Sequence, residues 1–110
     1  MSSLPDSVLS EIGKNITTLA ATTVKKFANQ AVSDGEAFVA TTQEQIANWA
    51  EQLANDQISQ KNFESLVRGE KDLAEMQGLE EAGLAQASID SFINGVIEIV
   101  INAVLGAITL

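Results

Sequence analysis

The chain contains neither cysteine nor histidine. Without cysteine it has no disulfide, no thiol nucleophile and no zinc–thiolate site. Without histidine it lacks the most common general base and the imidazole of Ser-His-Asp and Cys-His catalytic groups. It also lacks the Glu-x-x-His pairs that hold iron in carboxylate four-helix proteins. We therefore expect a protein that is not an enzyme and that binds no cofactor.

Positive charge is also scarce. Six Lys and Arg stand against 15 Asp and Glu, which gives a net charge of −9. Such a chain repels the phosphates of nucleic acids and anionic lipids, so we expect no nucleic-acid partner. One acidic cluster stands out in the sequence, made of Asp72, Glu75, Glu80 and Glu81. No calcium-loop pattern surrounds it, so it is interpreted as a solvated face and no metal site is expected.

Helix breakers are few. The only proline is Pro5, and Ala, Gln, Glu and Leu are abundant. This composition favours helix, and 110 residues suit a single domain, residues 1–110. The sequence therefore predicts an all-α fold. The first residues lack the basic stretch and apolar run of a secretory signal, so a cytoplasmic location is expected.

The first half of the chain has helical periodicity over residues ~5–54. Four large side chains recur every 11 residues: Ile16, Phe27, Phe38 and Trp49. Eleven residues make three helical turns, so these side chains would form one core stripe along a continuous helix. The stretch 33–36, Ser-Asp-Gly-Glu, offers a cap residue and a glycine, and a break near 34–35 remains open.

Residues 55–59 predict a turn, with Ser59 as the N-cap of a second helix over ~60–108. The stretch 53–66 resembles the short helical hairpins of small bacterial oligomerisation modules of the SHOCT type. The glycines of the second helix make a bend near 77–83 plausible. Two helices of this length would form an antiparallel hairpin of about 75 Å, or part of a small bundle that oligomerises.

The segment 89–110 contains only two charges, Asp90 and Glu98. Its Asn94-Gly95 pair between apolar runs is a β-hairpin signal. Against this, a polar stripe repeats every four residues through Asp90, Asn94, Glu98 and Asn102. Residues four apart line one face of an α-helix, so we favour helix.

The rest of this helix is a wide apolar surface, made of Phe92, Ile93, Val96, Ile97, Val100, Ile101, Val104, Leu105 and Ile108. A hairpin partner covers only about half of such a surface, and the remainder requires further cover. Copies of the chain, lipid and the rest of the same chain are the three possible covers. We favour a self-assembling structural or interaction protein, a homo-oligomer or filament joined through this helix.

The alternative is a small membrane-associated or pore-forming protein that inserts residues 89–110. In that case the polar stripe would line a pore. No Lys or Arg flanks the segment, so the charge cue for membrane orientation is missing. A stripe that simply faces solvent or a polar seam between subunits is the simpler interpretation.

Overall fold

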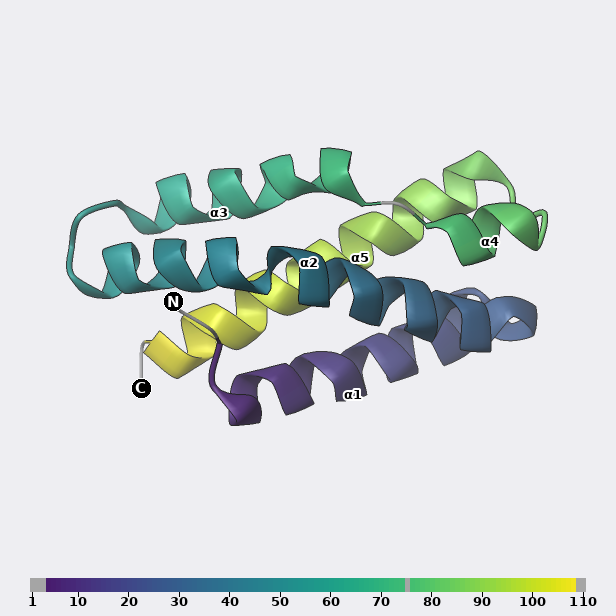
Figure 1. Cartoon of the computed structure of the whole chain (residues 1–110), viewed down its shortest axis with the longest axis horizontal. Helices are drawn as coiled ribbons and strands as arrows, with labels where there is room; N and C mark the ends of the chain where they lie inside the picture. The colour runs from purple at the N-terminus through teal and green to yellow at the C-terminus, as the bar shows by residue number, and fades with distance from the viewer. Residues whose placement is uncertain (1–3, 75, 109–110) are drawn as a thin grey trace.

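A computed structural model describes residues 4–74 and 76–108, and every regular element in this part of the chain is helical. The elements are α1 (Asp6–Thr23), the 3₁₀ turn η1 (Lys25–Phe27), α2 (Ala28–Ala54), α3 (Gln60–Gly69), the 3₁₀ turn η2 (Glu70–Leu73), α4 (Gln77–Glu81) and α5 (Gln86–Ile108). They occupy 43 × 24 × 23 Å with a radius of gyration of 13.8 Å (Figure 1). A folded chain of this length has a radius of about 13 Å. The all-helical prediction is confirmed, whereas the 75 Å hairpin does not form.

The first predicted helix breaks at Val24 and not at Gly35. α1 ends at Thr23, and the chain turns through η1 before α2 begins. The hydroxyls of Thr22 and Thr23 donate to the carbonyl of Leu19, at 3.1 and 2.6 Å. They satisfy an acceptor of the last helical turn, where the backbone ladder ends. Val24 then leaves the helical region, at φ −133° and ψ 49°, and is buried.

α2 is continuous through residues 33–36. Gly35 is buried at a close approach of three helices. A Cβ built on it would lie 2.9 Å from Ile16 Cγ2 of α1 and 3.7 Å from Phe92 Cζ of α5. Gly35 therefore allows close packing of the three helices, and of the two alternatives left open at this point the continuous helix is confirmed.

The break at Val24 divides the predicted core stripe. Ile16 lies on α1, Phe27 in η1, and Phe38 and Trp49 on α2. Ile16 and Phe38 are buried, while Phe27 and Trp49 are half-buried against the same core. One stripe along a single helix is therefore wrong, because residues 24–27 change the direction of the chain.

The predicted turn at residues 55–59 joins α2 to α3 and is confirmed. Ser59 Oγ accepts a hydrogen bond from the Asn62 backbone N–H at 3.1 Å. Asp56 adopts a positive φ of 60° in the turn, a conformation that Asp tolerates better than most residues. Ser59 is thus the N-cap of α3, as the sequence indicates.

The second predicted helix, 60–108, is not continuous. α3 ends at Gly69, and η2 and α4 follow before α5 begins at Gln86. Gly83 follows α4 with φ +89°, a conformation that glycine adopts at little cost. The Leu84 N–H bonds to the Leu79 carbonyl at 3.1 Å and closes the end of α4. The predicted bend at 77–83 is in fact a separate short helix and a glycine turn.

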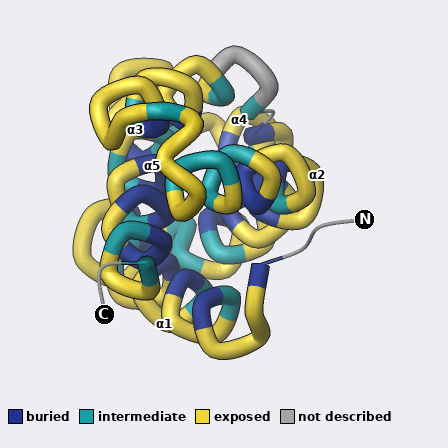
Figure 2. Tube along the Cα trace, turned by 90° about the vertical axis from the view of Figure 1, so that its left-hand side faces the viewer, coloured by how far each residue is buried: buried dark blue, intermediate teal, exposed yellow. Residues whose placement is uncertain are grey.

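α5 runs antiparallel beside α1 and also contacts α2, α3 and α4 (Figure 1). Leu19 of α1 packs on Gly95 of α5, where an added Cβ would meet its Cδ2 at 2.7 Å. Val8, near the start of α1, and Ala103, near the end of α5, line the same hollow between the two helices. α5 is helical through Asn94 and Gly95, so the β-hairpin alternative is wrong. Figure 2 shows the buried residues of these helices facing the interior.

Candidate functional site

Most of the predicted oligomerisation surface lies inside the chain. Only three of its side chains are half-buried, Ile93, Leu105 and Ile108. The others are at most 2% exposed: Phe92, Val96, Ile97, Val100, Ile101 and Val104. The sequence correctly indicates that this helix needs cover, but the other helices of the same chain supply it. Homo-oligomerisation through this helix stays a prediction.

The predicted polar stripe lies on the outer face of α5, where Asp90, Asn94, Glu98 and Asn102 are all exposed. The Gln86 side-chain amide donates to Asp90 Oδ1 at 2.9 Å. Arg68 of α3 donates to Glu98 Oε1 at 2.8 Å through Nη2. All four residues are exposed, so the position of the stripe in the folded chain fits the simpler solvent-facing interpretation.

Arg68 lies between two carboxylates. Besides Glu98 it pairs with Glu64, at 3.2 Å. The hydrogen bond to Glu98 raises the pKa of Arg68. Hydrogen bonds from Gln60 and then from Arg68 lower the pKa of Glu64. Because the side chains of Arg68 and Glu98 are 47% and 50% exposed, solvent screens this network, and it links α3 to α5 only weakly.

A polar contact that the sequence did not predict joins α2 to α4. Asp34 accepts hydrogen bonds from the backbone N–H groups of Gly78, at 3.2 Å, and Leu79, at 2.9 Å. N–H groups in the first turn of a helix have no acceptor within it, and an anion there is favoured. Asp34 belongs to the stretch 33–36 that offers a cap residue in the sequence, but the helix whose first N–H groups it binds begins more than 40 residues further along the chain.

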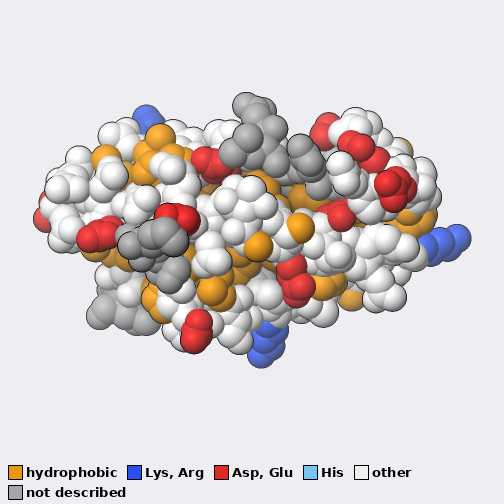
Figure 3. Space-filling model, viewed as in Figure 1, with side chains coloured by type: hydrophobic (Ala, Val, Ile, Leu, Met, Phe, Trp, Pro, Cys, Tyr) orange, Lys and Arg blue, Asp and Glu red, His pale blue; other side chains and the backbone are white. Residues whose placement is uncertain are grey.

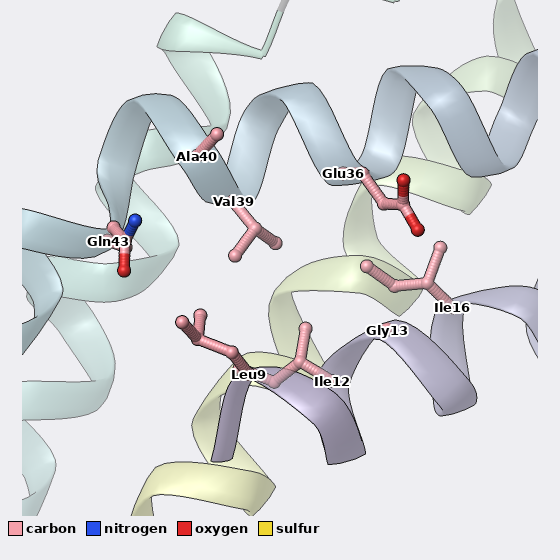
Figure 4. Close-up of a pocket in the computed structure, with 8 residues that line it drawn as sticks. All are labelled: Leu9, Ile12, Gly13, Ile16, Glu36, Val39, Ala40 and Gln43. Carbon is pink, nitrogen blue, oxygen red and sulfur yellow. The ribbon is translucent and has the colours of Figure 1, made fainter. Parts of the chain in front are cut away.

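A groove of about 260 Å³ lies between α1 and α2. Its lining is Leu9, Ile12, Gly13 and Ile16 from α1, and Glu36, Val39, Ala40 and Gln43 from α2 (Figure 4). Leu9 and Val39 point toward one another across it. On the face shown in Figure 3, hydrophobic side chains gather between these two helices. We call this feature the α1–α2 groove.

One acceptor in the α1–α2 groove is unpaired. Gln43 Oε1 is buried, and no described residue donates a hydrogen bond to it. A buried polar atom without a partner costs roughly 1–3 kcal/mol. In Figure 4 the Gln43 oxygen is directed toward α1. The Glu36 carboxylate lies at the other end of the groove, above Ile16. The groove therefore combines apolar walls with an acceptor at each end.

The sequence did not identify this groove, although an isolated glycine in a helical pattern is a signal for close approach or open space. Gly13 is such a glycine, and an added Cβ there would meet no atom within 4 Å. Neither of the groove's acceptors, Glu36 and Gln43, was singled out by the sequence as a site residue.

No three acidic side chains come together as a metal site within the described residues. Glu80 and Glu81 of the acidic cluster are exposed. Glu75 and the side chain of Asp72 lie outside the described residues.

A comparison with protein-family models found no match, and comparisons with curated proteins and with solved structures found none either. The function is therefore argued from the residues of this chain alone.

Proposed function

We propose that this chain is a non-enzymatic helical interaction protein that binds a partner helix in the α1–α2 groove. The observation that carries the proposal is the apolar lining that both helices give to the groove, with the exposed Glu36 carboxylate at one end. A wider hollow of about 620 Å³ lies between α1 and α5, but polar and charged residues such as Ser7, Glu11 and Lys14 line much of it. Among the described residues, the only large exposed hydrophobic residue is Leu66, at 38%. Partner sites combine apolar contact area with a few convergent polar groups, and this groove has both.

The shape of the groove favours a helix as the occupant. Leu9 and Ile16 stand two turns apart on α1, so the groove follows the helix axis for about 10.5 Å. Small-molecule sites enclose about 300–1,000 Å³, more than this open groove offers. A partner helix instead places single side chains at one-turn intervals into such a groove. Leu9, Glu36 and Ala40 of the groove are at least partly exposed, whereas most of the predicted apolar surface of α5 is buried in the core.

Filling the groove should abolish binding without unfolding the chain. Gly13→Leu places a side chain in open space in the groove and replaces a helical glycine, which favours the helix by roughly 0.5–1 kcal/mol. We expect helical peptides selected on the wild-type chain from a display library to bind Gly13→Leu at least about tenfold more weakly. Gly106→Leu is the matched control, because Gly106 is equally open and lies on α5. A selection that yields no peptide sensitive to Gly13→Leu would contradict the proposal.

A second candidate function is insertion of α5 into a membrane. Among the described residues, α5 is the one helix long and apolar enough to span, with 23 residues and a mean hydropathy of 1.8. At 1.5 Å per residue it measures about 34 Å, close to the thickness of a bilayer core. Core helices of soluble proteins have the same properties, and α5 has its apolar side in the core. Insertion would therefore require the helices to separate.

Vesicle flotation distinguishes the two candidates. With neutral phosphatidylcholine vesicles, which do not repel the acidic chain, membrane insertion predicts that the protein floats with lipid. It also predicts that α5 resists protease only when lipid is present. The groove proposal predicts that the folded chain stays in the dense fraction. Flotation of wild-type protein without denaturant would favour the membrane candidate.

A further inference from the structure

We infer that two copies of this chain associate about a two-fold axis, with α1 of each copy in the hollow between α1 and α5 of the other. This hollow encloses about 620 Å³ and lies on the side of α1 away from the α1–α2 groove. The inference therefore concerns a second surface and does not depend on the proposed function. It follows from the pattern of exposed residues on α1, the distribution of charge and the short side chains of α5.

An exposed stripe on α1 is complementary to itself. Ser7, Glu11, Lys14 and Thr18 follow one another at intervals of four, three and four residues, so they lie on one face of the helix. All four are exposed, and the first three line the hollow. When a second α1 runs antiparallel beside the first, this stripe meets its own reverse. Glu11 then faces Lys14 of the second copy, and Ser7 faces Thr18.

The two charges of the stripe have no partner within the described part of the chain. Although they are three residues apart, Glu11 and Lys14 form no ion pair with each other or with another described residue. A two-fold contact pairs both charges at once, because each Glu11 meets a Lys14 and each Lys14 meets a Glu11. Such exposed pairs add little affinity, but they set the register of the two helices and disfavour others.

The distribution of charge makes this side of the molecule the one on which copies repel each other least. α1 and η1 carry three Lys and two acids, whereas the rest of the chain carries three basic and 13 acidic residues. Because α1 begins beside the end of α5, an antiparallel α1 also brings Lys25 and Lys26 toward the end of α5 in the other copy. The last turn of α5 contains no basic residue, and the C-terminal end of a helix attracts positive charge.

The α5 side of the hollow leaves room for a second α1. Asn102, Gly106 and Ala107 are exposed there, and a Cβ added to Gly106 would meet no atom within 4 Å. Short side chains at a helix contact allow the two axes to approach to about 8 Å. In such a dimer, α1 and α5 of each copy would together form an antiparallel four-helix bundle.

Charge reversal tests the stripe. In sedimentation equilibrium from about 1 μM to 1 mM, the 11.7 kDa chain should be in exchange with a dimer. Glu11→Lys and Lys14→Glu should each weaken this dimer about tenfold or more, because like charges then face each other. The double variant Glu11→Lys/Lys14→Glu exchanges the two charges and should restore the wild-type dissociation constant. Lys61→Glu is the control for Lys14→Glu, because it makes the same charge change on an exposed residue outside the hollow.

Glu11→Lys separates a specific contact from the effect of net charge. It reduces the negative charge of the chain, so it would strengthen an association governed by overall repulsion alone. The two-fold contact predicts the opposite result, a weaker dimer.

Substitutions at two open glycines separate this contact from the α1–α2 groove. Gly106→Leu fills the hollow between α1 and α5 and should weaken the dimer about tenfold or more. Gly13→Leu fills the α1–α2 groove and should leave the dimer unchanged. Circular dichroism in urea shows whether each variant remains folded.

The absence of cysteine allows a direct test of the antiparallel register. Ser7→Cys and Thr18→Cys place thiols at facing positions of two different copies. On mild oxidation, a mixture of these two variants should form cross-linked dimer at least about tenfold faster than a mixture of Ser7→Cys and Thr17→Cys. Thr17 is the matched control, because it is also exposed but lies on a neighbouring face of α1.

The contrary outcomes are distinct. A wild-type chain that stays at 11.7 kDa up to about 1 mM would overturn the inference, and so would a double charge variant that fails to associate. A dimer that is lost in Gly13→Leu but kept in Gly106→Leu would place the second copy in the α1–α2 groove instead. A dimer that keeps its affinity in all of these variants uses another surface. The display selection with Gly13→Leu tests the proposed function separately.

Discussion

We expect Val100→Asp to unfold this protein and Asn102→Asp to leave it folded. Val100 is completely buried in the core formed by α5 and the helices around it, whereas Asn102 is exposed on the polar stripe. Burying an unpaired carboxylate costs several kcal/mol, which approaches the whole stability of a domain of this size. We expect a loss of at least about 4 kcal/mol for Val100→Asp and less than about 0.5 kcal/mol for Asn102→Asp. Urea denaturation followed by circular dichroism measures both.

The same pair of variants determines what covers α5. If the apolar face of α5 met lipid or other copies, Val100→Asp would leave a folded protein that had lost only assembly or membrane binding. A Val100→Asp variant with the wild-type urea midpoint would therefore contradict the packing of α5. Loss of helical signal in Val100→Asp alone would place α5 in the core.

The sequence predicts α5 well because its signal is local. The polar stripe and the apolar surface both follow from one helical period, and both are present in the structure. What covers the helix depends on where the chain reverses. Here it reverses between residues 70 and 85, through two short helices and Gly83. Glycines in that region indicate weakness in a helix but do not specify a new direction, so the compact arrangement was not predictable.

The break between α1 and α2 shows how a periodic pattern misleads. The 11-residue repeat keeps its phase from Ile16 to Trp49, so it predicts one helix. Each of the two helices, however, has its own side that faces the core. The short turn between them leaves the 11-residue spacing of the large side chains unchanged, so the repeat does not reveal the turn. The sequence signal for the break lies in Thr22, Thr23 and Val24. These three residues are β-branched, and β-branched side chains lose rotamer freedom in a helix.

The stretch 33–36 was interpreted locally, but its partners are distant. Gly35 contacts Ile16 and Phe92, and Asp34 bonds to the start of α4. Both residues are of the types that end helices, and both instead make tertiary contacts. The α1–α2 groove was missed for a related reason. Its lining comes from two helices whose relative orientation is set by the break at Val24, which the sequence did not locate.

Asp34→Ala is expected to release α4 from α2. The substitution leaves the N–H groups of Gly78 and Leu79 without their acceptor. Removing a capping carboxylate costs about 1–2 kcal/mol, and hydrogen bonds to a charged group contribute about 1.5–3 kcal/mol each. We expect a loss of about 2–4 kcal/mol in urea, with faster amide hydrogen exchange in residues 76–84 than elsewhere. Asp90→Ala is the control, because Asp90 also accepts a hydrogen bond, but within one exposed helix.

A second substitution tests the same contact, because its effect on stability should change sign when Asp34 is removed. A Cβ on Gly78 would lie 2.9 Å from Asp34 Oδ1, so Gly78→Ala should destabilise the wild-type chain. In the Asp34→Ala background the obstructing carboxylate is gone, and Gly78→Ala should be neutral or slightly stabilising, because alanine favours helix over glycine. The two substitutions therefore couple in a double-mutant cycle. Additive effects, or unchanged exchange across 76–84, would mean that the buried side chains of Met76 and Leu79 hold α4 without the help of Asp34.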